Sequence, residues 1–214
     1  MTLDRFASLL IIIHAVFGGI ALLTGTISII APKGKQWHKK SGKIFYYAML
    51  ATGISALIAA VLPGHTNPFL FVVGVFSTYF VISGYRALRY KKLKDVQGLY
   101  WDRVLAIVMS ITALSMLTYA VYLFINTNQA GWIMLVFGLL SLNTARLDFK
   151  ALKDWKSLRK KWLVMHIGKI TGGYIAAFTA FIVVNDVMHP LLNWLLPTVF
   201  GGVFIGYWLR RVKR

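Results

Sequence analysis

The residues of this chain that could do chemistry are a few ionisable and amide side chains set in or beside long apolar runs. His14 stands inside the first run, where an imidazole that titrates near neutral pH can relay a proton or bind a ligand. A second group lies near the ends of four runs: His38, Tyr46, Asp102, Asn143, Arg146, His166 and Lys169. Together they predict a polar pocket that suits an anionic or metal-bound ligand. The sequence therefore favours a protein that binds, and in one version moves, a small ligand or ion.

Several of these residues also have a purely structural explanation. A buried imidazole needs one good hydrogen-bond partner, so His14 is equally well explained by a hydroxyl or carbonyl on a neighbouring helix. Asp102 precedes an apolar run, where aspartate caps helices, and Arg146 suits the end of a span, where its charge reaches the headgroups. Asn143 is harder to explain in this way, because an amide one turn inside a short helix needs partners.

A redox protein is the first alternative, with His38 and His166 as ligands of a haem or a divalent metal. Counted from an outer boundary near Phe6 at 1.5 Å per residue, His14 lies about 12 Å deep, whereas His38 and His166 are expected at the cytoplasmic boundary. In a slab roughly 30 Å thick it is then on the order of 14 Å or more from the other two, so it cannot share an iron with them. A structural or assembly role in a membrane complex is the second alternative. No cofactor follows from the residues alone.

Common catalytic motifs are missing from the sequence. It has no Cys, which excludes thiolate metal sites and disulfides. It also has no Walker loop, dinucleotide fingerprint, HExxH or nucleophile elbow. These absences argue against the commonest enzyme classes, and we lean towards a protein that is not an enzyme.

Seven apolar runs must position the candidate residues. The chain is 58% hydrophobic and 14% charged, and a hydrocarbon layer needs about 20 apolar residues per helix. The runs lack the two-residue alternation of barrel strands, so helices are expected. We predict one all-α transmembrane domain over residues 1–214, an integral membrane bundle with spans at residues 7–30, 43–62, 68–88, 103–125, 131–145, 163–184 and 190–209.

The positive charges indicate how the bundle is oriented. Of 24 Lys and Arg residues, all but Arg5 fall in alternate connections between the runs, at the run ends that border those connections, or in the C-terminal tail, which predicts an outside N-terminus and a cytoplasmic C-terminus. We expect a multi-pass protein of the cytoplasmic (inner) cell membrane. The net charge of +18 flanks the helices, so it suits anionic lipid headgroups and not nucleic acid. Apolar residues at helical spacing also predict a basic amphipathic cytoplasmic connector at about residues 147–162.

Small residues at helical spacing predict where the helices pack closely. One face of the first run carries His14 above three small residues, so His14 should point into the bundle. The sixth run has a similar ladder and the last run a glycine pair. The residues are Gly18, Ala21 and Gly25; then Gly168, Gly172, Ala176 and Ala180; then Gly202 and Gly206.

The stretch from His14 to Ala56, with HAVFGGIALLTG and then KGKQWHKKSGKIFYY, resembles an uncharacterised bacterial family of polytopic membrane proteins, domain of unknown function 2306. Its members share a first-helix His before a Gly-rich run and a second His before a Gly and an aromatic. The later WLVMHIGKITGGYIAAFTAF is similar to the family's C-terminal part, although Met165 here precedes His166. The resemblance points to His14, His38 and His166 and implies no activity.

Overall fold

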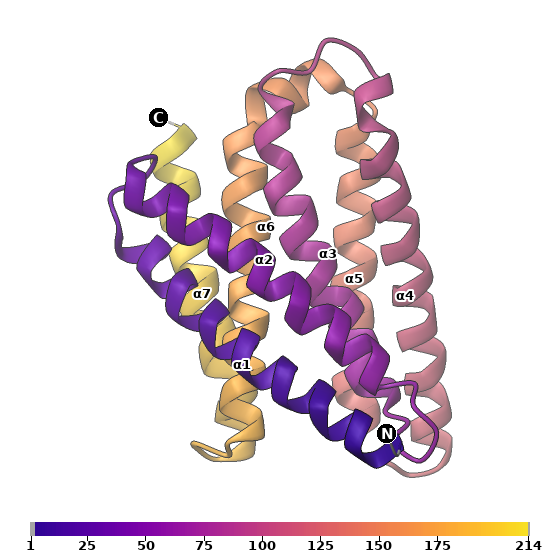
Figure 1. The fold of residues 1–214 in the computed structure, drawn as a ribbon. Helices are drawn as coiled ribbons and strands as arrows, with labels where there is room; N and C mark the ends of the chain where they lie inside the picture. Colours follow the sequence, from indigo (N-terminus) through magenta and orange to yellow (C-terminus); the bar gives the residue numbers. More distant parts are fainter. Residues whose placement is uncertain (1–2, 214) are drawn as a thin grey trace. The chain divides into compact units, whose positions relative to one another are not determined.

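The structure, a computed structural model, describes residues 3–213 and folds them into seven α-helices without a strand (Figure 1). The helices are α1 (Leu3–Ile30), α2 (Gln36–Ala59), α3 (Pro68–Tyr90), α4 (Tyr100–Ile125), α5 (Ala130–Leu152), α6 (Trp155–Val184) and α7 (Pro190–Lys213), and the 3₁₀ turn η1 (Gln97–Leu99) precedes α4. Each of the seven is long and apolar enough to cross a membrane. The predicted all-α class with seven transmembrane helices is confirmed.

The main difference from the predicted elements lies between the fifth and sixth spans. A separate amphipathic helix over residues 147–162 is not formed, because α5 continues to Leu152 and α6 already begins at Trp155. The turn is set by Asp154, whose Oδ1 accepts the backbone N–H of Ser157 at 3.0 Å, as a helix N-cap does. The apolar residues that suggested a surface helix are the extended ends of two spanning helices.

The chain, for which the sequence predicts one transmembrane domain, divides into two compact units. The first unit contains the residues up to Tyr85 and those from Val164 onward, which include α1, α2, α7 and most of α3 and α6. The second unit, Arg86–Leu163, contains η1, α4, α5 and the remaining turns of α3 and α6. Each unit is described by itself below.

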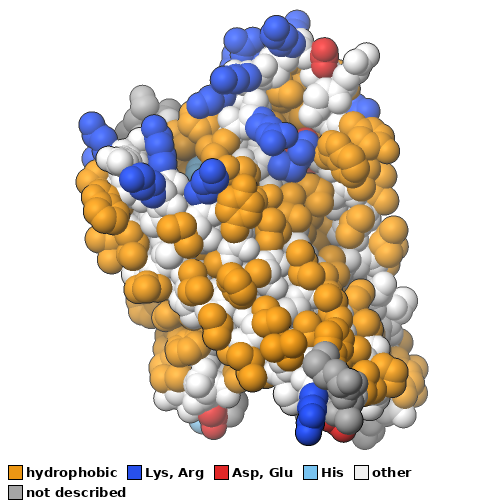
Figure 2. Space-filling model, viewed as in Figure 1, with side chains coloured by type: hydrophobic (Ala, Val, Ile, Leu, Met, Phe, Trp, Pro, Cys, Tyr) orange, Lys and Arg blue, Asp and Glu red, His pale blue; other side chains and the backbone are white. Residues whose placement is uncertain are grey.

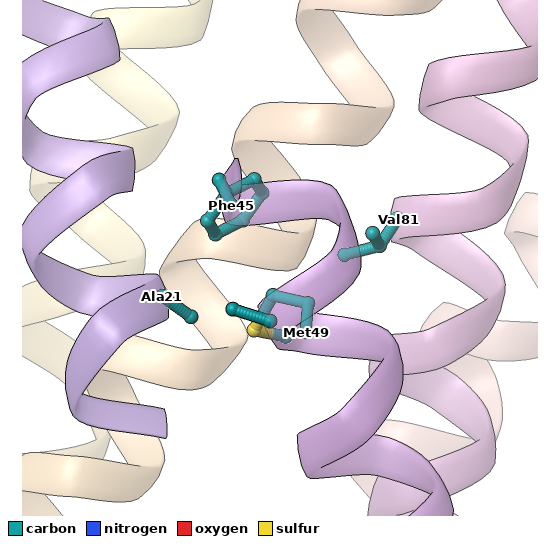
Figure 3. Packing of buried hydrophobic residues seen from close by; sticks show 5 residues of the cluster. Ala21, Phe45, Met49 and Val81 are labelled. Atoms are coloured by element: carbon teal, nitrogen blue, oxygen red, sulfur yellow. The ribbon is translucent and has the colours of Figure 1, made fainter. Parts of the chain in front are cut away.

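The first unit has a small apolar core between its helices. Ala21 of α1, Phe45 and Met49 of α2 and Val81 of α3 are buried against one another (Figure 3), and Tyr174 of α6 packs on the same cluster. In lipid, which is as apolar as these side chains, such a cluster is stabilised by close van der Waals contact between helices. The core therefore depends on small residues that allow the backbones to approach.

Glycines provide that approach in the first unit. A Cβ at Gly25 would lie 2.5 Å from the Tyr174 ring, and one at Gly84 would lie 2.6 Å from the backbone nitrogen of Ile170. Both distances are too short for a side chain, so α1 and α3 can contact α6 only because these residues are glycines. The prediction that the Gly25 face of α1 points into the bundle is confirmed.

The predicted small-residue faces of α6 and α7 are only partly correct. Gly172 packs against Phe80 of α3, where a Cβ would lie 3.0 Å from the ring. Gly168, Gly202 and Gly206, in contrast, are open, because a Cβ added at any of them would have no neighbouring atom within 4 Å. On α7 the close contact is made instead by Gly201, where a Cβ would overlap the side chain of Ile175. The prediction for α7 is wrong about the face, because spacing alone does not say which side of a helix meets a neighbour.

In the second unit, α4 and α5 lie side by side (Figure 1). Gly138 of α5 allows this pairing, since a Cβ there would lie 2.8 Å from Leu117 of α4.

The outward faces of the helices are apolar: the face in Figure 2 shows hydrophobic side chains along the helices and many Lys and Arg near helix ends. Exposed apolar faces of this extent are expected of helices that contact lipid.

Candidate functional site

Three of the predicted site residues are histidines of the first unit that share one hydrogen-bonding arrangement. In each, Nδ1 lies within hydrogen-bond distance of a main-chain carbonyl oxygen of another segment. The pairs are His14 with Thr52 at 3.0 Å, His38 with Ser28 at 2.9 Å, and His166 with Gly84 at 2.8 Å. The hydrogen-bonded explanation given for His14 is thus realised in the structure, by the backbone of α2.

This arrangement determines the tautomer of each ring. A carbonyl oxygen only accepts, so in each of these bonds Nδ1 carries the proton and donates it, while the Ser28 hydroxyl lies 3.1 Å from His38 Nδ1 as a second partner of that ring. In the neutral imidazole Nε2 is then left as an acceptor. Histidines that bind metals in proteins are held in the same way, with one ring N–H donated to a carbonyl or carboxylate. An oriented Nε2 lone pair can equally accept a hydrogen bond or a proton from a ligand.

His14 of α1 and His38 of α2 lie at different levels along α2. Thr52, the partner of His14, is fourteen residues beyond His38 on that helix, which corresponds to about 21 Å at 1.5 Å per residue. Since His14 is tied to Thr52 by a direct hydrogen bond, its ring cannot share a bound atom with His38. His14 is partly buried on the α1 face that meets α2.

Near the first turns of α2, His38 and His166 come into one neighbourhood. The helices that carry them are neighbours, because Tyr46 of α2 and Ile170 of α6 pack on the same apolar core. Tyr46 of α2 stacks on Tyr85 of α3, with ring centroids 4.1 Å apart and 20° between the planes. Tyr85 directly follows Gly84, whose carbonyl holds His166. The helices α2, α3 and α6 thus bring three predicted site residues together, which we call the histidine cluster: His38, Tyr46 and His166.

A buried lysine lies one turn from this cluster. Lys169 is only 7% exposed, and its Nζ donates to the Tyr79 hydroxyl at 2.8 Å while lying 4.5 Å from the centre of the same ring. Sequence reasoning placed Lys169 in the polar group but missed Tyr79, which looks like one of many aromatics of an apolar run. A cation inside a membrane-spanning helix is a functional candidate by default.

Asp102, in the second unit, has a different role from the one that its position suggested. The residue before α4 is Leu99, and Asp102 lies inside the first turn, so it is not the helix N-cap. Its carboxylate accepts from Arg86 Nε at 3.0 Å, from Arg86 Nη2 at 2.6 Å and from the Tyr90 hydroxyl at 2.8 Å. These three bonds fix the end of α3 to the start of α4. Asp102, Arg86 and Tyr90 form a buried structural contact between α3 and α4, which we call the Asp102 lock. Sequence reasoning missed both partners of Asp102.

The remaining predicted residues, Asn143 and Arg146, are exposed on α5 of the second unit. For Arg146 this exposure fits the structural explanation of a cation at a helix end. A buried acid close by, Asp148, is 7% exposed and is not singled out by the sequence, because it lies beyond the apolar part of its run. Of the eight predicted residues, five belong to the first unit, namely His14, His38, Tyr46, His166 and Lys169, and the other three to the second.

A cavity of about 550 Å³ lies in the first unit between α1, α6 and α7. Its lining is almost wholly apolar and includes Ile29, Phe178, Phe200 and Phe204. None of the eight predicted residues lines it. Within residues 3–213, no three His, Cys, Asp or Glu side chains gather in a way that would hold a metal ion. A metal at the histidine cluster would therefore take its other ligands from outside these residue types.

The helices described above define an integral membrane protein. The model of a family described as a predicted membrane protein, domain of unknown function 2306 (DUF2306), matches residues 11–99, from α1 to η1. The resemblance carried by the His14–Ala56 stretch is thereby confirmed. The match includes His14 and His38, whereas His166 lies outside it. No curated protein and no solved structure matches the chain.

Proposed function

We propose that this membrane protein binds a small ligand or ion at the histidine cluster, through Nε2 of His38 and of His166. The observation that supports the proposal is the anchoring of both rings by Nδ1–H bonds to main-chain carbonyls. Such bonds orient the imidazole and leave the opposite nitrogen for a partner. A ring that only stabilised the fold would need the Nδ1 bond alone.

The chemistry of the ligand follows from these acceptors. A neutral Nε2 binds an electron-poor centre, which is either an acidic proton or a transition-metal ion. Tyr46 adds an aromatic face from α2, and the charge of Lys169 lies one turn further along α6. The histidine cluster therefore suits a small molecule with an ionisable hydroxyl or acid group, or a metal-bound anion.

In transport of the ligand across the membrane, His14 would be a second binding position. Its Nε2 is an acceptor as well, and the distance of about 21 Å along α2 separates it from His38. A proton, which passes between imidazoles through hydrogen-bonded groups, is the ion that best fits two such separated acceptors. We propose this relay as the form that transport would take.

Redox chemistry is the second candidate, and the same ring orientation favours it. Two imidazoles with free Nε2 atoms are the axial ligands of a bis-histidine haem, whose porphyrin supplies the four other ligands. The position of His38 and His166 on the neighbouring helices α2 and α6 supports this alternative, and the separation of His14 leaves it no part in such a centre.

Asparagine variants test both candidates without removing the structural bond. An asparagine amide can replace the Nδ1–H donor, whereas it has no counterpart of Nε2. The set is His38→Asn and His166→Asn, with His65→Asn as the control, since the His65 side chain is 41% exposed and bonds only to Asp4 among the described contacts. The purified proteins would be compared by absorption spectrum, bound-metal content, and thermal shift with Zn²⁺, Ni²⁺, Cu²⁺ and added haem.

We expect at least one of these probes to stabilise the wild type and the control. At a probe concentration of 100 times Kd the stabilisation is about 2.7 kcal/mol, and it should vanish in both cluster variants. A Soret band that is lost in the same two variants would select the haem alternative. The proposal is overturned if no probe distinguishes the cluster variants from the control.

A further inference from the structure

The apolar cavity of the first unit has the form of a groove between α6 and α7 that reaches α1. Along α6 its lining runs from Thr171 to Ile182, about 16 Å of helix. Three phenylalanines, Phe178, Phe200 and Phe204, contribute to the walls. Water in such a groove would find almost no hydrogen-bond partner, so an apolar chain is the occupant that its lining favours.

Two cations stand just beyond one end of this groove. Lys33 Nζ lies 5.1 Å from the centre of the Trp208 ring, and the Arg211 guanidinium carbon lies 5.5 Å from the same centre. Trp208 contacts Phe204, the last lining residue of α7, with ring centroids 6.2 Å apart. Lys33 likewise follows the lining residue Ile29 by four positions. The apolar groove thus leads directly to a positively charged aromatic end.

We propose that this groove binds one acyl chain of an anionic phospholipid, whose phosphate lies against Lys33 and Arg211. The charge of the two side chains complements a phosphate, and a tryptophan between them is typical of the headgroup level. The apolar lining contacts the acyl chain of the same lipid. Phospholipid is also the medium that surrounds these helices in the membrane. This lipid site uses none of the residues of the histidine cluster.

The position of Lys33 supports the assignment. Its ammonium group donates to the carbonyls of Ser28 and Ile29 in the last turn of α1 and to that of Ala31 just after the helix, which holds it at the end of the groove. Burial lowers the pKa of the Lys33 amine from its ordinary value. A phosphate beside it would favour the charged form and so be bound more tightly.

The test is lipid retention by the full-length protein, measured by native mass spectrometry in detergent with added phosphatidylglycerol or phosphatidylcholine. The double variant Lys33→Gln/Arg211→Gln removes the two cations at Trp208. Its matched control, Lys35→Gln/Arg210→Gln, removes the same net charge from exposed neighbours. We expect each cation at Trp208 to strengthen retention of phosphatidylglycerol about fivefold, so that the double variant binds about 25-fold more weakly than the control.

A second variant tests the groove itself. Leu196→Trp places a larger side chain in the lining without changing the charge, and it should lower retention of phosphatidylglycerol while thermal melting remains close to wild type. Equal retention in the double variant and its control would overturn the proposal, as would equal retention of phosphatidylcholine and phosphatidylglycerol by the wild type. A dimer peak that is present in the wild-type mass spectrum and absent from that of Leu196→Trp would also overturn the proposal, since a second copy of the chain would then occupy the groove.

Discussion

The buried carboxylate of Asp102 allows the sharpest stability prediction. Asp102 is 5% exposed and receives two hydrogen bonds from Arg86 and one from Tyr90. Replacing it with alanine leaves a guanidinium and a hydroxyl without their shared acceptor. Removing one partner of a buried ion pair costs about 3–5 kcal/mol. Because the Arg86 side chain is 16% exposed and can recruit some water, we expect the lower end, about 3 kcal/mol, for Asp102→Ala.

The same lock can be divided into its parts by a second variant. Tyr90→Phe removes one hydrogen bond to the charged carboxylate and should cost about 1.5 kcal/mol. In the double variant Asp102→Ala/Tyr90→Phe the two effects should not add, since the phenol no longer has an acceptor to lose. We expect a coupling of about 1 kcal/mol between the two positions.

The assay is equilibrium unfolding of the detergent-purified protein, by titration with sodium dodecyl sulfate and by thermal melting, followed by circular dichroism. Asp4→Asn is the control, because the Asp4 side chain is 88% exposed and its exposed pair with His65 should contribute little. The control should stay within about 0.5 kcal/mol of wild type. If Asp102→Ala also unfolds within that range, the lock contributes no stability and the argument is wrong.

Three further outcomes are expected in the same unfolding assay. Gly84→Ala should destabilise by about 1–3 kcal/mol, because its Cβ would lie 2.6 Å from the Ile170 backbone, whereas Gly168→Ala, with open space, should be neutral or better; equal effects would contradict the close approach of α3 and α6. Tyr174→Phe removes the 2.6 Å bond between its hydroxyl and Thr26 and should cost about 0.6 kcal/mol, at most about 1.7, and a stabilised variant would refute this. His14→Ala should cost about 1 kcal/mol while His14→Asn retains most of the stability, and the reverse order would show that Nδ1 is not the anchored atom.

The local features of the first helix follow directly from the sequence. The spacing of His14, Gly18, Ala21 and Gly25 predicts one shared face, and the structure packs that face against α2 and α6. The seven spans also follow from the sequence. In a hydrocarbon phase the backbone must satisfy its own hydrogen bonds, so a long apolar run has few alternatives to a helix.

The sequence predicts the partners of the polar residues less well, because the type of a residue does not identify the residue that it contacts. Asp102 is recognisable as a rare acid beside a span, but its bonds to Arg86 and Tyr90 depend on how α3 and α4 meet across η1. Tyr79, the partner of buried Lys169, stands ninety residues away in the chain. No periodicity or local motif reports a contact of that sequence separation.

What the sequence determined by itself is the class of the protein: seven apolar helices with their cations in alternate connections, and a short set of histidines worth following. Length and hydropathy suffice for that, since a bilayer imposes one local solution on each apolar run. Only the tertiary structure decided which nitrogen of each imidazole is held by a carbonyl, which glycine of α7 meets α6, and where the apolar groove ends at Trp208. These properties arise from the contact of segments far apart in the chain, and packing between helices, not the preference of any one residue, selects them.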